Sequence, residues 1–97
     1  MAELSDYVLS LRGPIVVTGA SGFIGANLFK TLLRYRNDVF GIEQRRKSWR
    51  LADVKDDFVV TVDLNDQAAT KNLVDSLRPQ TVFSCIAYGA YSFEAKA

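Results

Sequence analysis

The sequence contains no histidine and only one cysteine, Cys85. Histidine is the commonest metal ligand and the commonest general base near neutral pH, so we expect no metal site and no histidine-dependent catalysis. A lone cysteine cannot form an internal disulfide. Because Cys85 lies in the apolar run TVFSCIA, we interpret it as a buried thiol of a reducing compartment rather than as a nucleophile.

The chain also lacks an excess of charge of one sign and any long apolar run. Its 12 basic and 11 acidic residues leave a formal net charge of +1 over 97 residues, so no overall field recruits nucleic acid or an anionic membrane. No apolar stretch approaches the ~20 residues that cross a bilayer. The beginning, MAELSDYVLSLRG, has early acidic residues and no apolar core, unlike a signal peptide. We therefore expect a cytoplasmic protein.

What the sequence does contain is a regular succession of apolar patterns. Four short, continuous apolar runs predict strands that are buried on both faces. They are PIVVTG, DVFGIE, FVVTV and TVFSCIA. Helical spacing predicts helices over residues 4–12, 23–36 and 63–78, the last with Asn65 or Asp66 as its N-cap. The side chains expected to face inward are Leu4, Val8 and Leu11 in the first helix, Ile24, Leu28, Thr31, Leu32 and Tyr35 in the second, and Ala69, Leu73, Val74 and Leu77 in the third.

The order of these elements predicts an α/β fold. Strands that alternate with helices imply a parallel sheet with right-handed crossovers. The order is that of the first half of a doubly wound parallel Rossmann sheet, with strand order 3-2-1-4, helices on both faces and an N-terminal helix within residues 1–13. The fourth strand would lie at a sheet edge, yet it carries none of the charges or prolines that protect such edges. We therefore expect further strands beside it, so that residues 14–97 form a partial domain.

The stretch VVTGASGFIG places three glycines directly after the first predicted strand, where the next helix begins. In a dinucleotide-binding turn, the first glycine permits the tight turn, the second lets the backbone approach a pyrophosphate, and the third lets the helix pack closely on the sheet. Backbone N–H groups at the positive end of the helix dipole then meet the phosphates. The flanking elements favour this interpretation over a merely tight turn. The expected cofactor-binding residues here are Gly19, Ser21, Gly22, Phe23, Ile24 and Gly25.

The segment VTGASGFIG is similar to the cofactor signature of the extended short-chain dehydrogenase/reductase family, the nucleotide-sugar epimerases and dehydratases. DVFGIE, VDL and PQTVFSCIA also resemble segments of that family. The resemblance covers Pro14 to Ala97, which corresponds to the N-terminal NAD(P)-binding portion of a full member. It implies that Asp63 meets the adenine, with Leu64 beside it, and that Ala87 lies at the ribose side. A helix-capping role is the alternative for Asp63.

The residues after the second predicted strand bear on the choice of cofactor. Glu43 ends that strand, where an acid accepts hydrogen bonds from the ribose hydroxyls and repels a 2′-phosphate, which favours NAD. Arg45 and Arg46, with Lys47 and Arg50 behind them, favour NADP, because arginines accept that phosphate. A solvated basic loop is the third interpretation. We expect NAD rather than NADP, and we expect Trp49 in the same loop to cover apolar surface.

The chemistry that the resemblance implies is transient hydride transfer at a sugar, assisted by a Tyr-x-x-x-Lys pair. No tyrosine in this chain has a lysine four residues later, so we assign no catalytic residue. We expect a truncated chain whose catalytic and substrate-binding regions lie beyond Ala97. A stand-alone NAD(P)-binding regulatory module is the alternative. Either the missing C-terminal half or a second copy of the chain is the expected partner of the uncovered sheet edge.

Overall fold

The structure is a computed structural model that describes residues 3–44 and 49–85. Four strands form one parallel sheet in the order β3-β2-β1-β4. Ile15 of β1 lies opposite both Val39 and Thr81, and Gly41 lies opposite Val59. The predicted α/β fold and strand order are therefore confirmed. The strands are β1 (Ile15–Thr18), β2 (Val39–Glu43), β3 (Val59–Thr61) and β4 (Thr81–Ser84).

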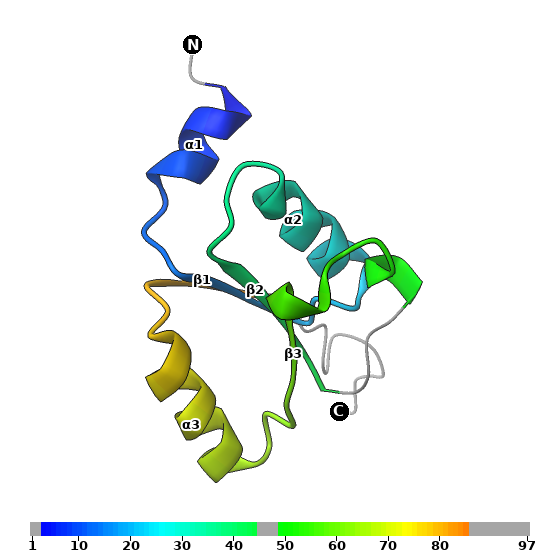
Figure 1. The fold of residues 1–97 in the computed structure, drawn as a ribbon, viewed down its shortest axis with the longest axis vertical. Helices are drawn as coiled ribbons and strands as arrows, with labels where there is room; N and C mark the ends of the chain where they lie inside the picture. The colour runs from blue at the N-terminus through cyan, green and yellow to red at the C-terminus, as the bar shows by residue number, and fades with distance from the viewer. Residues whose placement is uncertain (1–2, 45–48, 86–97) are drawn as a thin grey trace, which may run out of the picture.

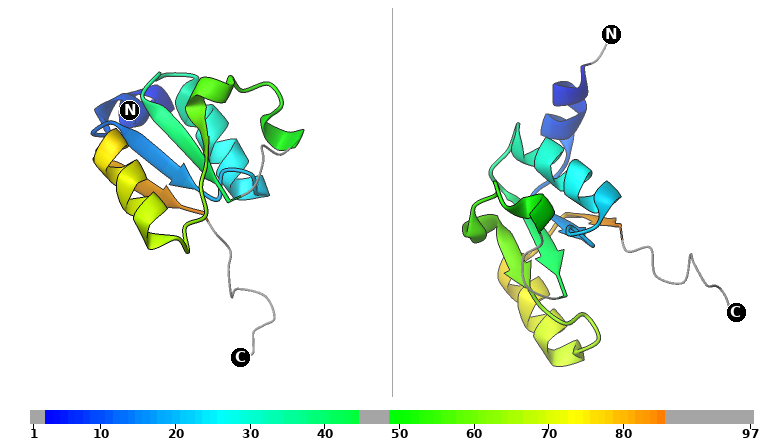
Figure 2. Two further views of the ribbon diagram at one scale, coloured as in Figure 1. Left: turned by 60° about the horizontal axis from the view of Figure 1, so that its bottom comes forward. Right: turned by 90° about the vertical axis from the view of Figure 1, so that its right-hand side faces the viewer.

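Helices cover both faces of the sheet, as predicted (Figures 1 and 2). Helix α2 (Phe23–Leu33) lies on one face, together with the 3-10 helix η1 (Trp49–Leu51), and α3 (Gln67–Leu77) lies on the other. A second 3-10 helix, η2 (Asp56–Phe58), leads into β3. Helix α1 (Leu4–Ser10) lies beyond the end of the sheet at which β1 begins (Figure 1). The core therefore forms mainly between the sheet and α2.

The contact between α2 and the sheet is very close. Phe29 is fully buried, and a Cβ added to Gly41 of β2 would come within 2.5 Å of the Phe29 ring. The missing side chain at Gly41 therefore lets the ring lie directly on the strand. The buried core cluster comprises Val8, Ile15, Val17, Ala20, Ala26, Phe29, Leu32, Val39, Leu51 and Val54.

The inward face predicted for the second helix is confirmed for Leu32, which is buried, and for Leu28, which packs against the core, but it is wrong for two other residues. Ile24 is 72% exposed and Tyr35 is 38% exposed, whereas Gly25, Ala26 and Phe29 are buried with Leu32. The prediction followed the larger apolar side chains, but close contact with the sheet requires small residues at the start of the helix. The helix also ends at Leu33, before the predicted end at residue 36.

The predicted faces of the other two helices are wrong in part. In α1, Val8 is buried and Leu11, just after the helix, packs on the core, but Leu4 is 57% exposed. Helix α3 is capped by Asp66, one of the two residues predicted for this role, whose carboxylate accepts a hydrogen bond from the Ala69 N–H at 3.1 Å. None of its residues is fully buried, and Val74 is 48% exposed. The sheet face under α3 is therefore the less completely covered one.

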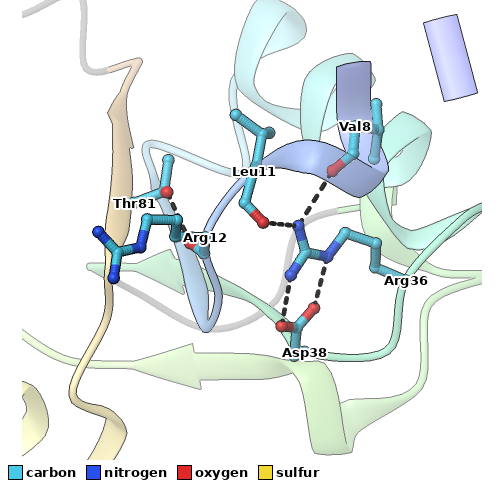
Figure 3. Close-up of polar contacts among 6 residues, drawn as sticks. All are labelled: Val8, Leu11, Arg12, Arg36, Asp38 and Thr81. Carbon is cyan, nitrogen blue, oxygen red and sulfur yellow. Dashed lines mark hydrogen bonds and ion pairs between the residues drawn. The ribbon is translucent and has the colours of Figure 1, made fainter. Parts of the chain in front are cut away.

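Arg36 attaches α1 to the sheet (Figure 3). Its Nε and Nη2 donate to the two carboxylate oxygens of Asp38 at 2.8 and 2.7 Å. Its Nη1 donates to the carbonyl oxygens of Val8 and Leu11, which lie where α1 ends. The Val8 carbonyl oxygen also accepts a hydrogen bond from the Leu11 N–H at 3.3 Å. A Cβ at Gly13 would overlap the Asp38 carboxylate. One guanidinium thus joins the end of α1 to the residue that precedes β2.

This contact predicts an acid-dependent contribution to stability. The hydrogen bonds from Arg36 hold the pKa of Asp38 below its ordinary value. The unfolded chain therefore binds a proton at this site more readily, and the contribution present at neutral pH is lost as the pH falls through the folded-state pKa. At pH 7 we expect Asp38→Asn to lower the free energy of unfolding by about 1–2 kcal/mol, so that the variant unfolds at a lower urea concentration. The difference from the unmodified chain should shrink below about pH 4. A difference that is constant from neutral to acid pH, measured by circular dichroism, would contradict this account.

Candidate functional site

The sequence-predicted site residues converge at one edge of the sheet. In a parallel sheet the carboxyl ends of all strands lie at the same edge, so the glycine turn after β1, Glu43 at the end of β2 and Asp63 after β3 share this edge. The backbone N–H of Cys85, after β4, donates to the carbonyl oxygen of Thr18 at 3.0 Å, which ties the fourth strand to the same edge. Arg45, Arg46 and Ala87 lie outside the described residues.

Two of the three glycines are required by the chain itself. Gly19 has a φ of 70°, a left-handed conformation that glycine adopts without steric cost. Gly25 lies in the first turn of α2, and a Cβ there would overlap the carbonyl oxygen of Gly19 and lie 2.8 Å from its carbonyl carbon. The tight turn and the close approach of α2 therefore each depend on a glycine.

Gly22 is different, because nothing in the described part of the chain requires a glycine there. Its φ of −76° and ψ of 170° suit any residue, and a Cβ would lie 3.5 Å from the Gly19 carbonyl oxygen, an ordinary contact distance. The residue is exposed at the N-cap of α2. Among the described residues, nothing therefore fills the space next to Gly22, and this space is open to solvent.

The backbone N–H groups in the first turn of α2 lie next to this space. The side chains of Phe23 and Ile24 are 69% and 72% exposed. Their N–H groups lie in the first turn of the helix, where N–H groups have no intrahelical partner. No acidic residue occurs in this turn, so the positive end of the helix dipole is not neutralised from within it. This arrangement suits an anion such as a phosphate group.

Glu43 occupies the position predicted for an acid at the end of β2. Because strand side chains alternate between faces, it shares the α2 face of the sheet with Val39 and Gly41. Its side chain is only 2% exposed. The sequence predicts where this carboxyl group lies, but its burial depends on the helix and loop that cover this face.

Asp63 lies in a small polar cluster after β3. Its Oδ1 accepts hydrogen bonds from the Asn65 backbone N–H at 2.9 Å and from the Gln44 amide at 3.1 Å. These two hydrogen bonds lower the pKa of the Asp63 carboxyl group, in that order of importance. Since Asp66 caps α3, the helix-capping alternative for Asp63 is wrong. Sequence reasoning missed Gln44, although its place directly after Glu43 brings it to the same edge.

A second group of residues, of which the sequence indicated Trp49 and Arg50 but not Lys30 and Asp53, lies beside the glycine turn. Arg50 of η1 directs its Nη1 to the carbonyl oxygen of Ser21, at 3.4 Å. Lys30 of α2 donates to the backbone carbonyl of Arg50 at 3.2 Å and pairs with Asp53 at 3.0 Å. Trp49 is 77% exposed, so the prediction that it covers apolar surface is wrong. No sequence signal indicates Lys30, because its partners lie at least 20 residues away.

The described ranges, residues 3–44 and 49–85, also bear on metal ligands and membrane-spanning helices. No group of three side chains that bind metals occurs there. No helix in those ranges is long and apolar enough to cross a bilayer.

The contrast between the glycines predicts different effects on stability. Gly25→Ala should lower the free energy of unfolding by at least about 2 kcal/mol, because the new methyl group overlaps the turn. Gly22→Ser should change it by less than about 0.5 kcal/mol, because serine is a favoured N-cap residue. Urea unfolding of both variants checks this expectation. Equal losses for the two variants would show that Gly22 is also required for packing.

Comparison with known proteins agrees with this geometry. The model of the NAD dependent epimerase/dehydratase family matches residues 15–97. No match was found among curated proteins or among solved structures. The matched range begins at β1 and includes the glycine turn and all four strands. The chain therefore belongs to the NAD dependent epimerase/dehydratase family.

Proposed function

We propose that this chain is the cofactor-binding portion of a nucleotide-sugar epimerase or dehydratase. The observation that carries the proposal is the open space over Gly22, which the packing of the described residues does not explain. A dinucleotide pyrophosphate needs the backbone to approach it without an intervening Cβ. Family membership supports a nicotinamide dinucleotide as the ligand.

The residues present suit such a cofactor. The N–H groups of Phe23 and Ile24, at the positive end of α2, would hold the pyrophosphate, and Ser21 would add a hydroxyl donor. Asp63 and Leu64 would hold the adenine, with the Asp63 carboxylate accepting from its amino group. Ala87 would lie along the ribose. The exposure of Asp63 after β3 supports this role, because the adenine amino group must reach its carboxylate.

The nicotinamide, when bound, supplies reversible transfer of a hydride from and to a sugar carbon. The described residues contribute the binding and orientation of the cofactor at the carboxyl edge of the sheet. We place the proton-transferring groups and the sugar site in a further part of the protein. β4 is an outer strand of the sheet, and its sequence TVFS contains no charge or proline that would protect a free edge, which supports a further strand of the same protein beside it.

We propose NAD rather than NADP as the cofactor. Glu43 at the end of β2 supports this choice, because an acid there accepts hydrogen bonds from the ribose hydroxyls and repels a 2′-phosphate. Arg45, Arg46 and Arg50 support the opposite choice. Binding of both dinucleotides to the same preparation decides between them.

A substitution at Gly22 tests the proposed function. In the intact protein, Gly22→Val should weaken binding of NAD⁺ and NADP⁺ by at least about tenfold, because branched carbons fill the space that the pyrophosphate needs. Isothermal titration calorimetry measures the affinities, and circular dichroism checks that the variant is folded. Lys71→Met, in an exposed ion pair on α3, is the control and should bind as the unmodified protein does. Unchanged affinity in folded Gly22→Val would refute the proposed site.

A further inference from the structure

We infer that Arg50 binds a phosphate group of the dinucleotide and that Lys30 is the residue that positions Arg50 to do so. The inference rests on the proposed function and adds two residues to that site. Both belong to a contact between α2 and the segment 49–54, which lies beside α2 on the same side of the sheet (Figure 1).

The guanidinium of Arg50 lies at the glycine turn but is poorly satisfied there. Its contact with the Ser21 carbonyl oxygen is long, at 3.4 Å, and one face lies over the Trp49 ring, 4.7 Å from its centroid. The ion pairs found in the described ranges do not include Arg50. A guanidinium stacked on an aromatic ring keeps the N–H donors at its edge available. Arg50 can therefore form a paired hydrogen bond with an incoming phosphate.

The position of this charge is unfavourable unless an anion is present. Ser21 directly precedes the N-cap of α2, so Arg50 holds a positive charge near the positive end of the helix dipole. The first turn of α2 contains no acidic residue that would compensate. A local conflict of this kind is typical of a functional site. A phosphate group at the turn would be attracted by the helix and by Arg50 together, which removes the conflict.

Lys30 acts on Arg50 through the backbone. Its Nζ donates to the carbonyl oxygen of Arg50 itself at 3.2 Å and pairs with Asp53 at 3.0 Å. The paired side chains are 39% and 69% exposed, so the ion pair adds little to stability. Leu51 and Val54 already anchor the segment in the core. The distinctive effect of Lys30 is therefore to hold the backbone of Arg50 against α2, so that the Arg50 side chain is directed toward the glycine turn.

A guanidinium binds either of two groups of the cofactor by the same chemistry: the pyrophosphate, which NAD⁺ and NADP⁺ share, or the 2′-phosphate, which only NADP⁺ carries. The experiment measures the affinities of the intact protein for NAD⁺ and NADP⁺ by calorimetry, in Arg50→Gln, in Lys30→Met and in the double variant. Arg50→Gln should weaken binding by about tenfold. An equal loss for both dinucleotides assigns Arg50 to the pyrophosphate, and a loss confined to NADP⁺ assigns it to the 2′-phosphate.

The double variant separates a positioning role from a merely structural one. Lys30→Met should weaken binding by about threefold alone but add nothing to Arg50→Gln, because the two residues act through one contact. Lys30→Arg should keep most of the affinity that Lys30→Met loses, because arginine also donates hydrogen bonds and carries a positive charge. Lys71→Met removes an equally simple lysine–aspartate pair on α3, at 2.9 Å, and should leave both affinities unchanged.

The outcomes that overturn the inference differ from those that overturn the proposed function. Full affinity of folded Arg50→Gln for both dinucleotides, with binding lost in Gly22→Val, refutes the role of Arg50 and leaves the proposed function in place. Additive losses in the double variant refute the positioning role of Lys30. Full affinity of folded Gly22→Val instead refutes the proposed function itself.

Discussion

The close approach of α2 to the sheet is the constraint on which the rest of this structure depends. Two glycines permit it: Gly25 lies against the Gly19 carbonyl, and Gly41 lies under the Phe29 ring. Both positions exclude even a methyl group, because a protein interior is packed too densely to absorb one. The same approach brings the first turn of α2 to the carboxyl edge of β1. Core packing and the geometry of the glycine turn therefore have one cause.

The two ends of the sheet are built from different interactions. At the carboxyl edge, the residues at which α2 begins, Gly22, Phe23 and Ile24, are exposed. At the opposite edge, Arg36 joins Asp38 to the carbonyl oxygens where α1 ends (Figure 3). Because these contacts to α1 and β2 are mainly polar and charged, they depend on pH, whereas the contact of α2 with the sheet depends on shape. Each end can therefore be perturbed separately.

The candidate site combines groups with opposing preferences. Glu43 is buried at the end of β2, and Arg50 lies at the turn only a few residues later in sequence. A carboxyl group favours ribose hydroxyls, whereas a guanidinium favours phosphate. The two groups occupy separate places, because Glu43 is enclosed at the end of β2 whereas Arg50 lies beside the Ser21 carbonyl oxygen.

The sequence by itself determined the strand order, the place of the glycine turn and the position of Glu43. These follow from local patterns: short apolar runs give strands, glycine spacing marks the turn, and parallel connectivity orders the sheet. The inward faces of the helices were harder to predict, because Ile24 and Val74 look like core residues until the helix is placed against the sheet. Only the tertiary structure decided which face of α2 is buried, that no described residue packs closely over Gly22, and that Lys30 contacts the backbone carbonyl of Arg50. Each of these depends on contacts between segments distant in sequence, whose distances no local pattern encodes.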